Sequence, residues 1–528
     1  MNRRGLLKHA GLIGAVAGLP LRPALAQEAG LRIVDLRAEG LVDPIGIQDQ
    51  DVRLSWRLEG QRRGITQTRC EVQAASTRAL LEAGTPDLWW AGEVLIRRSM
   101  DMGWLGARLA PRQKVFWRVV VRDDNAVRAT SAVATFEMGA LDGSAPGVPA
   151  ACTQTARPLF DNAAIQGLWQ KGFAAENAAL CDSARGALNA AFWDGAAFDV
   201  DVRALARRSM AGLTEPDRED MTILLPWTLW QRYGDTALAE RNWAAMVRHL
   251  RTIAEASPGN MRRGTKGYTD PDAPDASTPG DLIAMALWKR AVDAMAAVAH
   301  GAKRQPEAER YDQLSRDIAD AFAATFVKPD GTVGGGSQGA QALALRFGLV
   351  PEALRDGATA KLVADIRQRG GRLSTGRLGT VPALDVLADA GEAALVHDLL
   401  LRGDLVGGDA LSGFLLRRVA GIDPVEPGFL KWRFAPVLDP RLPRGGASYD
   451  SVLGRIVTDW TYSPGRFEAR ITVPGNSRAE VWLPAASVDA VREGGRALGS
   501  VEGVTVVGVR DGRVVLEVGS GEYVFTIA

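Results

Sequence analysis

The chain has 528 residues, of which 46% are hydrophobic and 24% are charged. Its 63 Lys and Arg residues nearly balance its 62 Asp and Glu residues, which argues against disorder and against a nucleic-acid partner. At roughly 150 residues per domain, this length predicts three or four domains. After the N-terminus, nothing approaches the roughly 18 consecutive apolar residues of a membrane span, so we expect no membrane partner for the mature chain.

The first 26 residues have the pattern of an export signal. Arg3 and Arg4 precede an apolar run over residues 11–19, and Ala24 and Ala26 form an Ala-x-Ala cleavage site. This order is similar to a twin-arginine signal peptide that is cut after Ala26. We therefore expect a periplasmic or secreted mature chain, with an ordinary amphipathic N-terminus as the alternative.

Cysteine and histidine are too scattered to indicate a disulfide framework or a metal site. The isolated residues are Cys70, Cys152, Cys181, His9, His249, His300 and His397. We expect core thiols, no metal and no organic cofactor.

Residues 27–141 predict an antiparallel β-sandwich of the immunoglobulin or fibronectin type III kind. Leu54, Trp56 and Leu58 alternate with polar residues, and the alternation returns over residues 117–121. Breaks rich in turn-forming residues separate such runs, as in a sandwich of short strands.

The period of the apolar residues changes to that of helices after a linker. Gly, Ala and Pro are concentrated before Pro149, and we expect a linker over 142–164. Helical spacing follows over 165–425, as in the series Leu282, Met285, Trp288, Val292 and Met295. Turn signals cut this region into helices of ordinary length. It predicts an all-α domain, either a bundle or an (α/α)6 toroid.

Residues 426–528 return to the alternation of strands and predict a C-terminal antiparallel β-sandwich. Ile456, Thr458 and Trp460 open one such run. Asp511 and Gly512 lie between two apolar runs, which is typical of a tight β-hairpin. The expected order is therefore β-sandwich, helical domain, β-sandwich.

Several motifs in this order resemble bacterial α-L-rhamnosidases. The stretches DPIGIQDQDVRLSWRLEG and FWRVVVRDDN are similar to the family's N-terminal fibronectin-type domain. The stretches MTILLPWTLWQRYGDT, GGGSQGAQALALRFGLVP, GGRLSTGRLGT and RRVAGIDPVEPGFLKWRFAP are similar to its (α/α)6 domain and the start of its C-terminal sandwich. The resemblance implies hydrolysis of terminal α-L-rhamnosides with inversion, and thus a partner that is a rhamnose-containing glycoside or polysaccharide. Two carboxyl groups about 6.5–9.5 Å apart would perform this reaction.

The two motifs that carry these carboxyl groups in the family are missing from the chain. The stretch ALCDSARGALNAAFWDG stands in place of the acid-bearing form DCPQRDERLGWxGD, with Asp182 and Asp194 as nearby carboxylates. The IWERWD-like segment of the base and its Asn-His motif have no counterpart. Because an acid or a base each contributes about 10²- to 10⁴-fold, we expect that the loss of both reduces hydrolysis to near background.

Other positions still match the family's pocket. EDMTILLPW resembles a GDAxxxxPW segment and places Asp220 there, in an acidic cluster that could raise a pKa or simply begin a helix. Asp270 and Asp272 fall in KGYTDPDAPDAS, which matches a GDWLDPDAP-like pocket loop. Trp227 and Trp230 could stack on a sugar ring or pack in the core.

Three hypotheses follow for function. The first is a shortened α-L-rhamnosidase or a related glycosidase that uses carboxylates such as Asp220. The second is a non-catalytic sugar-binding or relic protein on the same scaffold. The third is a lyase, although the sequence shows no Tyr or His base with a cation beside it. The oligomeric state stays open.

Overall fold

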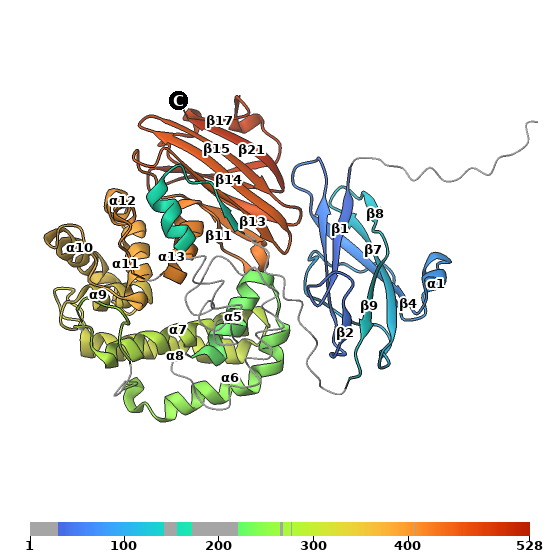
Figure 1. Ribbon diagram of the computed structural model, residues 1–528, viewed down its shortest axis with the longest axis horizontal. Helices are drawn as coiled ribbons and strands as arrows, with labels where there is room; N and C mark the ends of the chain where they lie inside the picture. The colour runs from blue at the N-terminus through green and yellow to red at the C-terminus, as the bar shows by residue number, and fades with distance from the viewer. Residues whose placement is uncertain are drawn as a thin grey trace, which may run out of the picture.

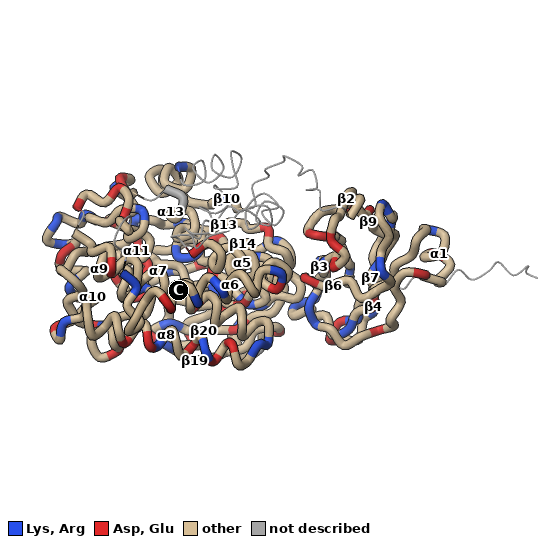
Figure 2. Tube along the Cα trace, turned by 90° about the horizontal axis from the view of Figure 1, so that it is seen from below, with Lys and Arg blue, Asp and Glu red and all other residues tan. Residues whose placement is uncertain are grey.

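The computed structural model describes residues 30–141, 156–171, 220–263, 268–275, 277–406 and 408–527. The predicted signal peptide and the segment that contains Asp182 and Asp194 lie outside these ranges. Figure 1 shows a β-domain beside a helical domain, and a second β-domain stacked on the helices. Within the described ranges, no helix is both long and apolar enough to cross a membrane. Both signs of charge are interspersed over the chain (Figure 2).

The N-terminal domain consists of two sheets that face each other. One sheet has the order β1 (Arg32–Ala38), β3 (Arg53–Glu59) and β6 (Met102–Gly103). The other has the order β2 (Ile45–Ile47), β9 (Ala134–Met138), β7 (Lys114–Asp123), β4 (Gln67–Ala75) and β5 (Trp89–Trp90), with β8 (Arg128–Thr130) paired to β7. A short helix, α1 (Arg78–Glu82), follows β4.

The alternation of apolar and polar residues along the strands determines which side chains form the core of this domain. Leu54, Trp56 and Leu58 on β3 are buried, as are Trp117 and Val119 on β7. Their polar neighbours point outward because successive side chains of a strand face opposite sides of the sheet. The predicted sandwich is therefore confirmed.

The segment before the helices departs from the predicted linker over 142–164. Ala156–Pro158 form β10, which pairs with β13 of the C-terminal domain, and a helix begins at residue 163. Ile165 and Trp169 of that helix are buried in the core. The strand has only three residues, too few for a visible alternation, so the sequence pattern missed it.

The helical domain has two layers. The inner row is α5 (Met221–Tyr233), α7 (Gly280–Gly301), α9 (Gln338–Arg346), α11 (Arg377–Asp389) and α13 (Gly408–Phe414), each packed on the next. The outer layer is α6 (Ala237–Glu255), α8 (Gln305–Phe326), α10 (Glu352–Gln368) and α12 (Ala393–Arg402). Short helical turns follow α6 at Pro258–Asn260 and α13 at Leu415–Val419, the latter a π-helix.

Burial distinguishes the two layers. Leu282, Met285 and Trp288 on α7 are fully buried, and apolar side chains surround this inner helix. On the outer helix α8, Tyr311 and Phe322 mark a single buried face. A helix that is apolar around its circumference belongs in a protein interior, whereas an amphipathic one covers a surface. The predicted all-α domain is confirmed.

The C-terminal domain is also a two-sheet sandwich. One sheet has the order β10, β13 (Arg444–Ser451), β14 (Gly454–Ser463), β15 (Arg466–Val473), β21 (Gly521–Ile527), β17 (Val491–Glu493) and β18 (Arg496–Ala497). The other has the order β11 (Asp423–Pro424), β12 (Lys431–Phe434), β16 (Arg478–Leu483), β20 (Arg513–Val518) and β19 (Val504–Arg510). Single helical turns lie at Pro427–Phe429, Val488–Ala490 and Leu498–Ser500.

The predicted hairpin closes the smaller sheet. Arg510 pairs with Arg513, so Asp511 and Gly512 form a two-residue turn. Both have positive φ, 49° and 70°, as the favoured hairpin turn requires.

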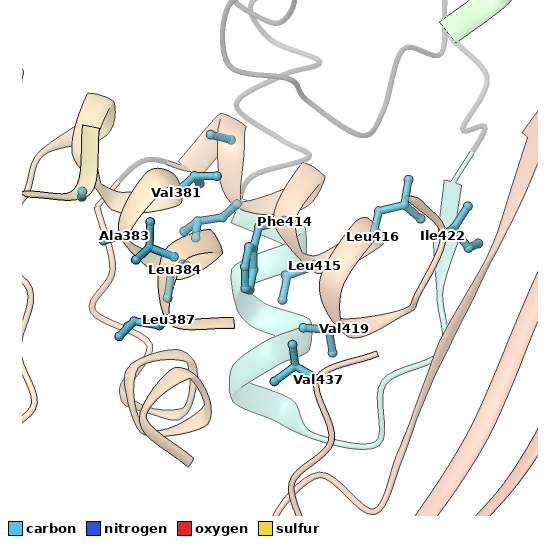
Figure 3. Packing of buried hydrophobic residues seen from close by; sticks show 14 of the residues in the cluster. Val381, Ala383, Leu384, Leu387, Phe414, Leu415, Leu416, Val419, Ile422 and Val437 are labelled. Carbon is cyan, nitrogen blue, oxygen red and sulfur yellow. The ribbon is translucent and has the colours of Figure 1, made fainter. Parts of the chain in front are cut away.

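One apolar core joins the helices to the C-terminal sandwich. Leu384 of α11, Phe414 of α13 and Val437 belong to the same cluster (Figure 3). The N-terminal domain has its own core. It contacts the rest through the buried side chain of Met100, which packs near Gly234 and Gly428, and through polar contacts. Examples are the Arg63–Glu493 ion pair of 2.7 Å and the 2.9 Å bond from the Thr236 hydroxyl to Asp101.

Candidate functional site

A cavity of about 550 Å³ lies within the inner row of helices. This volume is within the usual range of small-molecule sites, about 300–1,000 Å³. All five described inner helices, together with the π-helix, contribute to its wall, and no outer helix does. The lining residues are Trp227, Gln231, Lys289, Arg290, Asp293, Ala294, Ala297, Arg346, Phe347, Gly348, Leu378, Val381, Pro382, Asp385, Ala410 and Arg417. We call it the central cavity.

Part of the wall is apolar and aromatic. Trp227 of α5 is half-buried, so one part of its indole packs on the core while another part borders the cavity. Phe347, Leu378 and Val381 border the same space. Such a surface can hold the apolar face of a hexose without requiring hydrogen bonds.

Asp385 of α11 is the buried anion of the cavity wall. It is 5% exposed and accepts hydrogen bonds from Arg346 at 3.2 Å and Arg417 at 3.3 Å. Arg418 forms a third ion pair at 3.8 Å. A buried carboxylate needs this compensation because its desolvation costs several kcal/mol. The cluster ties α11 to α9 and to the π-helix, and it brings guanidinium donors to the cavity.

A second carboxyl group, that of Asp293 on α7, also borders the cavity. Lys289 donates to it at 2.6 Å and the Ser315 hydroxyl at 2.6 Å. Its side chain is 43% exposed, whereas that of Asp385 is 7% exposed. Asp293 is therefore the more accessible of the two carboxyl groups in the described lining.

Asp270 holds the start of α11, the helix that carries Asp385. Its carboxylate accepts hydrogen bonds from the backbone N–H groups of Gly376 at 2.8 Å and Leu378 at 2.7 Å. Burial raises the pKa of this carboxyl group, and the bonds from the helix start oppose the rise. Asp270 thus acts on the cavity indirectly, through the helix that it caps.

Glycines in two of the family-like motifs make room for the Asp270 loop. A Cβ atom on Gly376 would lie 2.0 Å from the carbonyl oxygen of Pro271, and one on Gly379 would lie 2.9 Å from the Asp270 carboxylate. On Gly339, it would lie 2.6 Å from the Thr278 hydroxyl. The glycines of STGRLGT and GGGSQGAQ therefore serve close backbone packing.

Asp220 lies in a buried network away from the central cavity. Its side chain is fully buried, with one oxygen 2.9 Å from Nε2 of His249 and the other 2.8 Å from Nη1 of Arg262. Both oxygens are bonded and neither faces solvent. This geometry gives Asp220 the role of joining the start of α5 to α6 and the following loop, and it does not present a free acid to a substrate.

The other residues singled out from the sequence fall in different places. Trp227 borders the central cavity, whereas Trp230 packs against Gly301 at the end of α7. Asp272 forms an exposed 2.8 Å ion pair with Arg377 and does not line the cavity. Asp182 lies outside the described residues.

Sequence reasoning missed the charged lining of the cavity. Asp385 lies in PALDVLAD and Arg417 in FLLRRV, so each interrupts an apolar helical run. A charged residue within an apolar helical run is expected to have a partner of opposite charge in the core. This pattern was the signal in the sequence that could have indicated Asp385 and Arg417. The partners themselves are 32 residues apart and could not be paired from the sequence.

Comparisons with known proteins agree with this architecture. The family model described as the bacterial alpha-L-rhamnosidase 6 hairpin glycosidase domain matches residues 210–407. The Rha78A-like N-terminal immunoglobulin domain matches residues 33–142, and the bacterial alpha-L-rhamnosidase C-terminal domain matches 421–497. These three matches follow the order of the three domains and together span most of the chain.

Three relatives bear the name alpha-L-rhamnosidase. One, from Streptomyces avermitilis, is 30% identical over 345 residues, which is 58% of this chain and 32% of the relative. Another, from an Alteromonas species, is 26% identical over 314 residues, which is 50% of this chain and 34% of the relative. The matched region thus spans about a third of each relative's length.

Solved structures share the fold. The Streptomyces avermitilis alpha-L-rhamnosidase complexed with L-rhamnose has a TM-score of 0.83 at 14% identity, over 94% of this chain and 100% of that chain. The alpha-L-rhamnosidase from Dictyoglumus thermophilum gives the same score and identity, over 94% and 99%. The fold is therefore that of α-L-rhamnosidases. With the three domain matches, the chain belongs to the bacterial α-L-rhamnosidase family.

Proposed function

We propose that the chain is a glycoside hydrolase that takes a terminal α-L-rhamnosyl group into the central cavity. The observation that carries this proposal is a cavity of about 550 Å³ inside the inner row, lined by an aromatic ring, guanidinium groups and carboxyl groups. Sugar sites commonly combine such an apolar face with a few placed polar groups. The alternating inner and outer helices support an (α/α)6 toroid as the complete domain.

Each kind of lining residue has a place in the proposed site. The indole of Trp227 supplies a surface for the apolar face of the sugar, and Arg346 and Arg417 supply hydrogen-bond donors for its hydroxyl groups. Asp293 is the carboxyl group that we assign to proton transfer, because its side chain is the more accessible one. Asp385 anchors the arginines.

Inverting hydrolysis needs a second carboxyl group. Asp182 and Asp194, which stand where the family carries its acid motif, are candidates from the sequence beside Asp220. The twin-arginine pattern of residues 1–26 supports action outside the cytoplasm. A rhamnose-containing glycoside or polysaccharide is the proposed substrate.

Hydrolysis of p-nitrophenyl α-L-rhamnoside by the purified chain tests the proposal. We expect Asp293→Asn to lower kcat by about 100-fold or more, the usual cost of losing an acid or base. Trp227→Ala should mainly raise KM, because stacking holds the sugar before and during reaction alike. Asp182→Asn and Asp220→Asn complete the panel.

Trp230→Phe is the matched control, because Trp230 packs against Gly301 outside the cavity. Its rate should equal that of the wild type. Hydrolysis that is unchanged in Asp293→Asn and Trp227→Ala would place the site elsewhere. Rhamnose binding without any hydrolysis would favour the non-catalytic sugar-binding alternative.

A further inference from the structure

An exposed tryptophan is held in a fixed orientation on the N-terminal domain. Trp90, on the edge strand β5, is 62% exposed, although tryptophan side chains are on average largely buried. Its Nε1–H donates to Oε1 of Glu71 at 2.7 Å, and Glu71 is itself 8% exposed. The bond to a buried carboxylate fixes the indole while the side chain stays largely accessible to solvent.

Trp90 ends a row of polar side chains that crosses three strands. Gln73 of β4 pairs in register with Trp90 of β5 and with Arg118 of β7. The Gln73 amide donates to Glu71 at 2.6 Å, and Nε of Arg118 donates to the Gln73 amide oxygen at 2.7 Å. A strand spacing of about 4.8 Å places Trp90 and Arg118 about 10 Å apart. We call these side chains the Trp90 row.

Charge on the surrounding sheet face is unbalanced. Glu93 pairs with Arg122 at 3.0 Å and Arg69 at 4.0 Å, and Glu71 pairs with Arg128 at 3.9 Å. Among the described residues, Arg118 has no carboxylate within ion-pair distance, and its hydrogen bond goes to a neutral amide. Three arginines thus share two glutamates while Arg118 adds a further positive charge, and the face is complementary to an anion.

The geometry of Arg118 suits a carboxylate. Gln73 occupies its Nε, which leaves the Nη1 and Nη2 groups as a planar fork of donors. A planar carboxylate accepts from such a fork in a bidentate manner. The aromatic face at the other end of the row suits the apolar face of a pyranose ring.

We propose that the Trp90 row binds a glycan that contains uronic acid, with one sugar ring on Trp90 and a carboxylate at Arg118. The row lies on the six-stranded sheet, on the side of the N-terminal domain away from the helices (Figure 1). It is therefore separate from the central cavity and binds a glycan chain without acting on it. This binding does not require that the cavity hydrolyse rhamnosides.

Affinity gel electrophoresis of the full chain tests the proposal with three polymers: polygalacturonate, neutral dextran and dextran sulfate. Polygalacturonate should retard the wild type most strongly. Trp90→Ala and Arg118→Gln should each weaken this association by about tenfold or more, the usual effect of removing a central contact residue. Trp90→Phe keeps an aromatic face and should restore part of the binding.

Leu105→Ala is the control, because Leu105 is a 74% exposed apolar residue of the same domain outside the row. It should bind as the wild type does, and p-nitrophenyl rhamnoside turnover should be equal in all these variants. Added salt should reduce the Arg118 effect more than the Trp90 effect, since screening weakens only the charged contact.

Three results would overturn the proposal: no retardation of the wild type by polygalacturonate, equal retardation of Trp90→Ala, or stronger retardation by dextran sulfate. If polygalacturonate retards the wild type but the wild type does not hydrolyse p-nitrophenyl rhamnoside, the proposed hydrolysis is contradicted and the proposed glycan binding at the Trp90 row is not. The two failures are therefore distinguishable.

Discussion

At the scale of single residues, the helical domain depends on buried charges that are matched side by side. Asp220 pairs with Arg262, and Asp385 with Arg346 and Arg417. A buried ion pair gains little over apolar packing, but breaking one leaves an uncompensated charge. These ion pairs therefore add little net stability, but the fold is strongly destabilised when one partner of a pair is removed.

Asp385→Ala should lower the free energy of unfolding by about 3–5 kcal/mol, because three guanidinium groups would lose their shared counter-charge. Urea unfolding measures the loss. Asp389→Ala is the matched control one turn further along α11, since Asp389 is 68% exposed and, among the described residues, forms an ion pair with Arg418 alone. It should cost at most about 1 kcal/mol. Equal losses in the two variants would contradict the role given to Asp385.

Some residues of the candidate sugar site could be predicted from the sequence, but their roles could not. Trp227 was a candidate and borders the central cavity, while Asp220 and Asp270 were candidates and proved to be fully occupied by hydrogen bonds. A motif match locates a position along the chain. It does not show whether the side chain faces a cavity, because that depends on partners such as Arg262, 42 residues away.

At the scale of elements, the start of α11 depends on close contact with the loop that precedes α7. Gly376→Ala should lower the free energy of unfolding by about 1–3 kcal/mol, the usual cost of overpacking. The reason is the 2.0 Å approach of a Cβ atom to the Pro271 carbonyl oxygen. The same shift should weaken sugar binding, because Leu378 and Asp385 follow on this helix.

Gly335→Ala is the control for this prediction. No described atom lies within 4 Å of a Cβ atom built at Gly335, and the φ of Gly335 is not among the positive values. Its unfolding free energy should stay within about 0.5 kcal/mol of the wild type. If Gly376→Ala is as stable as this control, the loop that contains Pro271 moves without cost and the predicted overpacking is contradicted.

Element identity was largely readable from periodicity, and the exceptions have a physical cause. The long helix α7 was predictable from apolar residues spaced by about 3.6 residues, and the strand β3 from apolar residues spaced by two. Each element buries a regular set of side chains. β10 did not, because its three residues owe their conformation to pairing with β13. Strands defined by a distant partner leave no local pattern.

At the scale of the whole molecule, Asp101 couples the N-terminal domain to α6. Its side chain is 3% exposed, contacts Arg53 at 3.4 Å and accepts from the Thr236 hydroxyl at 2.9 Å. Burial raises the pKa of Asp101 to about 6, with repulsion from Asp235 adding to the rise and Arg53 opposing it. The unfolded chain has the ordinary lower value.

Because the folded state holds this proton more tightly, the stability that it contributes is present at low pH and is lost as pH rises through about 6. Asp101→Asn cannot titrate. The thermal midpoint of the wild type minus that of the variant should therefore fall as pH rises from 4 to 6, by an amount equivalent to at most about 3 kcal/mol. Scanning calorimetry measures it. A difference that is constant or grows with pH would contradict the raised pKa.

The order of the three domains was predictable from the sequence, but the cavity was not. The two β-domains show the alternation of strands and the domain between them shows the spacing of helices, and a single sequence reveals both patterns. The cavity arises where five inner helices meet, and its charged lining comes from residues between 289 and 417. Such a space depends on how helices pack, so it is visible only in three dimensions.

The proposed function places a rhamnosyl group in the cavity inside the inner row of helices. Isothermal titration of the purified chain with L-rhamnose tests it most directly, beside Trp227→Ala and Trp230→Phe. We expect one bound sugar per chain, binding weakened about tenfold or more in Trp227→Ala, and unchanged binding in Trp230→Phe. Wild-type affinity in Trp227→Ala, or no binding to the wild type, would contradict it.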